Sequence, residues 1–331
     1  MMYQLTDAFG RKLNYLRISV TDRCNLRCIY CAPSKNFRWK QRNRIMTFEE
    51  IIRVTRLFAE MGVKKIRITG GEPLVRRNLD GLISQLSSIP GIGTIAMTTN
   101  GVLLKENIHR LKKAGLTSIN ISLDTLRRNR FMELTLSDAH QDVIDGIDKA
   151  IEAGFTPVKI NMVVIAGVND DEVIDFVELA KTTPVNVRFI EFMPFKFNNW
   201  SMDSFVSGKK IRSDIEKCYK LIPTGKDHDD TSGPAKDYRI EGFAGTVSFI
   251  TPMSDHFCGA CNRIRLTADG SIKPCLFSAG EVNTLKSLRN GTGNEEIMEK
   301  IRVAITTKPE HHLQTGELIR MENRAMIQIG G

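Results

Sequence analysis

Six of the seven cysteines in this 331-residue chain fall into two groups of three. The first group has the spacing C-x3-C-x2-C within the stretch TDRCNLRCIYC, and its members are Cys24, Cys28 and Cys31. The second group contains a Cys-x-x-Cys pair, and its members are Cys258, Cys261 and Cys275. No apolar run is long enough to span a bilayer and no charged-then-apolar leader opens the chain, so we expect a cytoplasmic protein. Thiols stay reduced there, and such spacings then indicate metal ligands or catalytic groups.

The first group has too few ligands for a closed zinc site. Structural zinc takes four ligands, and no fourth Cys or His lies near these three cysteines in the sequence. A redox Cys-x-x-Cys pair would not need Cys24. Iron–sulfur clusters are held by Cys thiolates, and three thiolates on a four-iron cluster would leave one iron open to another ligand. The spacing therefore favours an iron–sulfur cluster.

The second group could, by its residues alone, form a zinc site. The stretch RIRLTADGSIKPC predicts a hairpin that turns at Asp269-Gly270 and brings Cys275 back toward Cys258 and Cys261. His256 could complete a Cys3His zinc site. The seventh cysteine, Cys218, lies in a helical pattern and is predicted to be a small buried residue.

Alternating strand and helix patterns position the first group. Strand patterns are predicted at 14–20, 64–69, 94–98, 118–123, 158–165 and 185–190. Helical patterns are predicted near 48–61, 79–88, 104–114, 139–153, 170–182 and 209–220. Each strand has one apolar and one polar face, whereas a doubly wound sheet is apolar on both faces and a complete barrel is filled with Val, Ile and Leu. The pattern predicts an incomplete (β/α)6 TIM-type barrel with a polar lumen.

The pattern changes near residue 222. We predict a partial-barrel domain over 1–221, with the first cysteine group, and a C-terminal region over 222–331. That region has strand patterns near 237–240, 246–250, 263–267 and 272–275 and a helix near 294–306. It would close the open side of the barrel and ends in Gly330-Gly331.

The charge pattern predicts an anionic ligand. The net charge is +9, and six cations fall on strand faces expected to point inward, namely Arg17, Arg67, Lys159, Arg188, Arg263 and Arg265. A buried charge without a counter-charge is costly, and Arg matches phosphate oxygens well. A nucleoside triphosphate would suit such a lumen. The alternative is that Glu72, Asp124 and Glu191 neutralise some of these cations.

Motifs along nearly the whole chain resemble a known family. The first cysteine group, with Tyr30 before its last member, resembles the radical S-adenosylmethionine (SAM) superfamily. The chain further resembles the GTP 3′,8-cyclases of molybdenum cofactor biosynthesis in DAFGRKLNYLRISVTDRCNLRCIYC, IRITGGEPLVRR, TTNG, NISLDTL, GVNDDE, RFIEFMP, FCGACNRIRLTADGSIKPCLF and the terminal Gly-Gly.

The resemblance implies two [4Fe–4S] clusters, SAM and GTP. Cluster 1, on Cys24, Cys28 and Cys31, would chelate SAM, and cluster 2, on Cys258, Cys261 and Cys275, would bind guanine. Further SAM contacts would be Tyr30, Gly71, Ser122 and Met193. GTP contacts would be Arg17, Arg67, Thr98, Lys159, Arg188, Arg263, Ile264 and Arg265. The tail residues Gly330 and Gly331 would reach into the site.

The implied activity is that of a radical SAM lyase. A 5′-deoxyadenosyl radical would abstract the C3′ hydrogen of GTP, and C3′ would then add to C8 of guanine to give 3′,8-cyclo-7,8-dihydro-GTP. The product would pass to a cyclic pyranopterin monophosphate synthase. An electron donor such as flavodoxin or ferredoxin is expected, and the sequence leaves room for a homodimer.

Two other functions compete with this interpretation. The first is a radical SAM enzyme with an auxiliary cluster that modifies peptides. The second, from another class, is a basic zinc protein that binds nucleic acid. A nucleic-acid partner is disfavoured because aromatic residues make up 7% of the chain and several cations fall on inward strand faces. A membrane partner is not expected.

Overall fold

A computed structural model describes residues 4–31, 39–225 and 233–330 of the chain. The six strands of the predicted barrel are all present, within one residue of the predicted ends. They are β1 (Tyr15–Ser19), β2 (Lys65–Thr69), β3 (Thr94–Thr99), β4 (Ser118–Ser122), β5 (Val158–Val164) and β6 (Val185–Glu191). The C-terminal part adds β7 (Ile222–Pro223), β8 (Lys236–Arg239), β9 (Thr246–Ile250), β10 (Arg263–Leu266), β11 (Ser271–Lys273) and β12 (Val282–Asn283).

All these strands belong to one curved sheet. Its order in the described ranges is β12-β11-β10-β1-β2-β3-β4-β5-β6-β9-β8-β7. The strands from β10 to β9 in this order are parallel, whereas β11, β12, β8 and β7 form antiparallel hairpins at the two ends. The six β/α units of an incomplete barrel are therefore confirmed. The C-terminal strands extend the sheet at both ends, and β10 pairs directly with β1.

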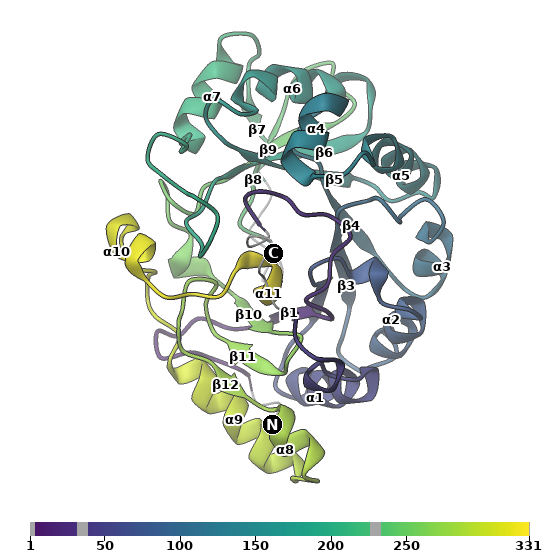
Figure 1. The fold of residues 1–331 in the computed structure, drawn as a ribbon, viewed down its shortest axis with the longest axis vertical. Coiled ribbons are helices and arrows are strands. Elements are labelled where there is room, and N and C mark those ends of the chain that lie inside the picture. Colours follow the sequence, from purple (N-terminus) through teal and green to yellow (C-terminus); the bar gives the residue numbers. More distant parts are fainter. Residues whose placement is uncertain (1–3, 32–38, 226–232, 331) are drawn as a thin grey trace.

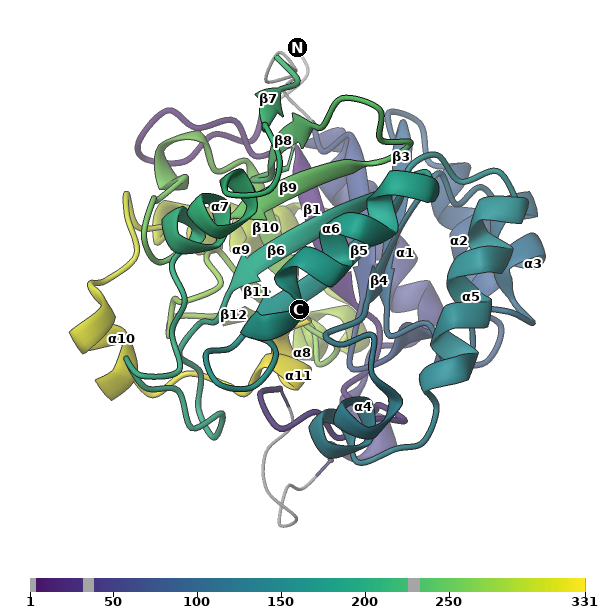
Figure 2. The ribbon, with the colours of Figure 1, turned by 90° about the horizontal axis from the view of Figure 1, so that it is seen from above.

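The helices that follow the barrel strands cover the outside of this sheet (Figures 1 and 2). Those that follow the six barrel strands are α1 (Phe48–Glu60), α2 (Leu79–Ser87), α3 (Ile108–Lys113), α5 (His140–Glu152), α6 (Val173–Thr182) and α7 (Gly208–Glu216). The others are α4 (Arg128–Thr135), α8 (Leu285–Arg289), α9 (Asn294–Thr306), α10 (Thr315–Arg320) and α11 (Met326–Ile329). A capping box starts α1, since Thr47 Oγ1 accepts from Glu50 N at 3.2 Å and Glu50 Oε2 accepts from Thr47 N at 2.8 Å. Such a cap stabilises a helix by about 1 kcal/mol.

The hydrophobic core lies between the sheet and these outer helices. Leu16 and Ile18 on β1 are fully buried in it, as are Ile51 and Phe58 on α1. Each such side chain contributes about 1.5–3 kcal/mol relative to an exposed one. Because side chains alternate along a strand, the residues between the core positions face the lumen instead. This alternation places Arg17 inside the barrel.

Some sequence predictions were wrong in detail. The helix predicted from 104 begins at Ile108, and α4, α8, α10 and α11 were not predicted. Cys218 is exposed rather than buried. The division at residue 221 stays a prediction, although β9 and β10 join the sheet of the preceding strands. In the described ranges, each helix is too short or too polar to traverse a bilayer.

Candidate active site

The first cysteine group borders a cavity at the carboxyl ends of the barrel strands. Cys24, Cys28 and Cys31 lie in the loop after β1, and we call the space beside them the first cavity. The same cavity is lined by all four residues expected to contact SAM, Tyr30, Gly71, Ser122 and Met193. The carboxyl end of parallel strands is where barrel enzymes place their sites.

The three thiols converge closely enough to affect one another. Burial raises the pKa of Cys24 to about 11, and burial with the charges of Cys24 and Asp124 raises that of Cys31 to about 12. Burial and the neighbouring Cys31 raise the pKa of Cys28 well above its usual value. A metal centre deprotonates the thiols that bind it. Three neighbouring thiols, whose pKa values are raised although Arg27 lies beside Cys24, therefore fit a cationic group as their ligand.

Gly70 and Gly71 pack closely against the loop that carries Cys24. A Cβ at Gly71 would lie 2.3 Å from the Arg23 carbonyl oxygen, and one at Gly70 would lie 2.9 Å from the Thr21 oxygen. Gly71 N donates to Thr21 O at 2.7 Å, and Glu72 N donates to Arg23 O at 2.8 Å. Gly71 is one of the expected SAM contacts. In the structure the two glycines admit the backbone of the cysteine loop itself.

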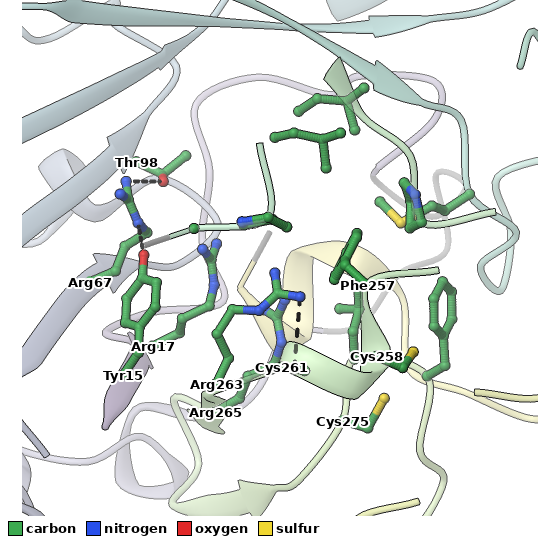
Figure 3. Close-up of a pocket in the computed structure, with 18 of the residues that line it drawn as sticks. Tyr15, Arg17, Arg67, Thr98, Phe257, Cys258, Cys261, Arg263, Arg265 and Cys275 are labelled. Atoms are coloured by element: carbon green, nitrogen blue, oxygen red, sulfur yellow. Dashed lines mark hydrogen bonds between the residues drawn. The ribbon is translucent and has the colours of Figure 1, made fainter. Parts of the chain in front are cut away.

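The second cysteine group borders a neighbouring cavity inside the barrel, which we call the second cavity (Figure 3). Eight cations line it, and none of its described lining residues is Asp or Glu. The cations are Arg17, Lys65, Arg67, Lys159, Arg188, Arg263, Arg265 and Lys308. The two cavities share the lining residues Thr98, Asn161, Ile190, Met193 and Met326, so they adjoin within one lumen.

The three carboxylates considered as partners for these cations bind elsewhere. Glu72 accepts from Thr99 Oγ1 at 2.8 Å and from Asn100 N at 2.7 Å. Asp124 accepts from the Tyr30 hydroxyl and from Val163 N. Glu191 accepts from Gly208 N at 2.7 Å and Met253 N at 2.8 Å. The alternative, that these carboxylates neutralise the lumen cations, is therefore not supported.

The pKa values reflect this concentration of positive charge. Burial and the nearby Arg188 and Arg67 lower the pKa of Lys159 to about 7. Burial, with Arg17 and Arg263 nearby, lowers the pKa of Arg265 well below its usual range. Asp237 is the one described carboxylate that offsets the effect at Arg188. Such a site strongly favours a multiply charged anion as its ligand.

Two cations contact one thiol of the second group. Lys308 Nζ lies 3.5 Å and Arg263 Nη2 lies 3.8 Å from Cys261 Sγ. Although burial raises the pKa of Cys261, the charges of these two residues lower it to about 6. Cys258 and Cys275 border the same space (Figure 3). A thiolate is thus prepared at Cys261, as a metal cluster requires.

The zinc alternative finds little support. His256 Nδ1 lies 2.9 Å from Pro252 O, and it is His312, packed against His256, that lines the second cavity. A zinc site would need its sulfur ligands to lie about 2.3 Å from one central point. In the part of the chain that the structure describes, no three Cys, His, Asp or Glu side chains converge on a single-ion site.

The C-terminal tail lies in the lumen against the carboxyl ends of β1 and β2. Gly330 has a φ of +73°, and a Cβ there would lie 2.3 Å from Thr69 Oγ1 and 3.2 Å from Ser19 Cβ. The Gly330 carbonyl accepts a hydrogen bond from Arg265. Figure 1 shows α11 within the ring of strands. Gly331 lies outside the described residues.

The lumen brings together nearly all the residues expected to contact GTP. Arg17, Arg67, Thr98, Lys159, Arg188, Arg263 and Arg265 all line the second cavity. Ile264 does not, because its side chain is fully buried in the core, and only its backbone could face a ligand. The sequence interpretation missed Tyr15, Lys65 and Lys308. The alternation that placed Arg17 and Arg67 inward also places Tyr15 and Lys65 there, two residues earlier.

Comparisons with known proteins agree with this geometry. The sequence model of the radical SAM superfamily matches residues 18–180, and that of Molybdenum Cofactor Synthesis C matches residues 185–314. The chain is 46% identical to the mitochondrial GTP 3′,8-cyclase of Arabidopsis thaliana over 99% of this chain and 83% of that one. It is also 46% identical to the GTP 3′,8-cyclase of Alkaliphilus metalliredigens, over 99% and 100% of the two chains. With human molybdenum cofactor biosynthesis protein 1 the identity is 44%, over 98% of this chain and 51% of that one.

Solved structures share the fold at low sequence identity. Streptococcus suis SuiB has a TM-score of 0.61 at 16% identity, covering 98% of this chain and 78% of its own. The enzyme anSMEcpe with bound AdoMet has a TM-score of 0.57 at 15% identity, covering 86% and 82% of the two chains. These similarities concern the fold alone.

Proposed function

This chain belongs to the GTP 3′,8-cyclases of the radical SAM superfamily, and from that premise we propose how its lumen carries out the reaction. The reaction converts GTP to 3′,8-cyclo-7,8-dihydro-GTP, the first step of molybdenum cofactor biosynthesis. One observation supports the assignment of residues above all. Two cysteine groups border adjoining cavities, and the one expected to hold GTP is lined by eight cations and no described carboxylate.

The first cavity would hold the radical-generating cofactors. Cys24, Cys28 and Cys31 would bind a [4Fe–4S] cluster, and Tyr30, Gly71, Ser122 and Met193 would surround SAM. When bound, this pair supplies one-electron cleavage of SAM and hence a radical able to take hydrogen from carbon. The protein's part is to orient these groups: Asp124 accepts a hydrogen bond from the Tyr30 hydroxyl and so fixes that ring beside the cysteine loop.

The second cavity would hold the substrate. Arg17, Arg67, Lys159 and Arg188 would bind the triphosphate, since Arg and Lys side chains neutralise phosphate oxygens. The second cysteine group would hold another [4Fe–4S] cluster beside the guanine. Holding C3′ near the first cavity and C8 near C3′ is the proximity contribution to catalysis. The shared lining residues support this arrangement, because the two cavities adjoin within one lumen.

The remaining expectations also belong to this proposal. The terminal Gly-Gly would contribute to catalysis, and the hydrogen bond from Arg265 to Gly330 O supports this for Gly330. A one-electron donor such as flavodoxin or ferredoxin would reduce the first cluster. A cyclic pyranopterin monophosphate synthase would take the product. Cytoplasmic location and a homodimer stay predictions. The peptide-modifying and zinc nucleic-acid alternatives are not favoured, because near-full-length relatives are named as GTP 3′,8-cyclases.

Anaerobic reconstitution tests the proposal. Two four-iron clusters would give about eight irons per chain, with zinc measured alongside. The protein should cleave SAM with dithionite and convert GTP to the cyclic product. Arg17→Met and Lys159→Met should abolish GTP conversion while SAM cleavage continues, whereas Arg110→Met on exposed α3 should change neither. A zinc-loaded protein, or full GTP conversion by both lumen variants, would refute the assignment.

A further inference from the structure

One phenol lies within a block of cations on the wall of the second cavity. Strands β10, β1 and β2 pair in parallel, and their registers align two rows of three residues that face the lumen. The rows are Arg263–Tyr15–Lys65 and Arg265–Arg17–Arg67. Like charges on directly opposed strand positions repel. Tyr15 is the one member of the block that is not a cation.

Tyr15 contacts the cations around it. Its hydroxyl accepts a hydrogen bond from Arg67 Nε (Figure 3). The hydroxyl also interacts with the guanidinium group of Arg17. Lys65 Nζ lies 4.8 Å from the centre of the Tyr15 ring. The side chain is almost completely buried, with 3% of its surface exposed. The phenol therefore connects three of the eight cations that line the cavity.

The contacts of Tyr15 fix the guanidinium group of Arg67. Nε donates to Tyr15, while Nη1 donates to Met97 O and Thr98 Oγ1, each at 3.2 Å. Two bonded nitrogens define the plane of the group and leave Nη2 as the nitrogen for a ligand, since no described acceptor binds it. Without the hydroxyl, Arg67 would keep only the bonds of Nη1 and could rotate about them.

The electrostatics agree with this geometry. Burial raises the pKa of Tyr15, but the charges of Arg67, Arg17 and Lys65 outweigh it and bring the pKa to about 7. These cations therefore favour the deprotonated form of the Tyr15 oxygen. The described lining of the cavity contains no Asp or Glu.

We propose that Tyr15 is a positioning residue for the GTP triphosphate, which holds Arg17 and Arg67 in the arrangement that binds phosphate and lessens their repulsion before the substrate arrives. The inference rests on the proposed function. Ordering side chains at a binding site costs free energy, and a site that is ordered in advance binds more tightly. Tyr15 would not touch the reacting atoms, and its effect would act through the two arginines.

Anaerobic calorimetry of Tyr15→Phe tests the proposal, with GTP and with inorganic tripolyphosphate as ligands. Loss of one hydrogen bond to a charged group should raise both Kd values about tenfold. SAM cleavage without GTP and the thermal midpoint should stay close to wild type. Tyr238→Phe is the matched control, because Tyr238 is also buried and accepts from Arg212 Nη1 at 3.1 Å but lies outside both cavities. It should leave both Kd values unchanged.

A second variant separates positioning from simple stability. In an Arg67→Met background, Tyr15→Phe should change the tripolyphosphate Kd much less than in the wild-type background, because residues that act through one another are not additive. Unchanged or tighter tripolyphosphate binding by Tyr15→Phe would overturn the inference, as would full additivity with Arg67→Met. If the wild-type protein itself bound no GTP, the proposed function would fail instead.

Discussion

Replacing Gly71 by alanine should displace the loop that carries Cys24. The new Cβ would lie 2.3 Å from Arg23 O, 2.6 Å from Arg23 C and 2.9 Å from Asp22 O. These are backbone atoms, so no side-chain rotation relieves the overlap. Overpacking of this kind costs about 1–3 kcal/mol. The shifted loop would also lose its bonds to Gly71 N and Glu72 N, each worth about 0.5–1.5 kcal/mol.

The total is about 2–6 kcal/mol against the native position of the loop. Even the lower value makes that position about thirtyfold less populated. We therefore expect Gly71→Ala to lose the first cluster and keep the second, so that iron falls from about eight to about four per chain. SAM cleavage with dithionite should fall with it. Iron and sulfide analysis and the SAM cleavage assay measure the two effects.

Gly81→Ala supplies the matched control. Gly81 lies in α2, and a Cβ there would meet no atom within 4 Å. Since alanine favours a helix by about 1 kcal/mol over glycine, this variant should keep both clusters. If Gly71→Ala kept about eight irons and wild-type SAM cleavage, the loop would yield without cost and the steric reasoning would be refuted.

Three further predictions concern the lumen. Raising the pH from about 7.5 to 9 should weaken GTP binding by up to about tenfold per pH unit. The reason is that Lys159, with a pKa of about 7, loses the positive charge that binds a triphosphate. Calorimetry should measure this, and Lys159→Arg should show a flatter dependence of affinity on pH. Gly330→Ala should lower cyclisation while SAM cleavage continues, because the positive φ at this position costs an L-residue about 1–2 kcal/mol and the new Cβ would overlap Thr69. Adding Thr69→Ala should restore part of the activity. Unchanged product formation by Gly330→Ala would show that the tail is not needed. Lys308→Met should lower the free energy of unfolding of the metal-free protein by roughly 2–4 kcal/mol, because the carbonyls of Arg263 and Pro274 lose the ammonium group that donates to them. Chemical denaturation measures this difference. No change would mean that water replaces the ammonium group.

The barrel and most of the lumen could be predicted from local sequence. The alternation of Leu16, Arg17 and Ile18 fixes which side chain faces inward, because strand geometry has a period of two residues. The spacing of Cys24, Cys28 and Cys31 predicts a three-thiol site whatever the rest of the fold. Both signals depend on neighbours in the chain, and both led to residues that line the two cavities.

What could not be predicted depends on contacts between distant segments. The pairing of β10 with β1 sets Arg263 beside Tyr15, and no local pattern specifies it. The carboxylate of Glu191 looked available to lumen cations in sequence. In the structure this carboxylate accepts hydrogen bonds from the backbone N–H groups of Gly208 and Met253, which lie well after it in the chain. Tertiary structure decides which side chains accept hydrogen bonds from the backbone of distant loops, and a count of charges in the sequence does not predict it.

The position of β1 between β2 and β10 affects how the chain can be made. Asn14, beside the start of β1, bonds Asn262, which lies 248 residues later in the chain. At about 5–20 residues per second, a ribosome needs roughly 12–50 seconds to bridge that interval. Until then one edge of β1 has no partner strand, and a strand with an open edge invites pairing with other chains. A nascent chain of this protein therefore needs shielding for most of its synthesis, and truncation before residue 262 should favour aggregation.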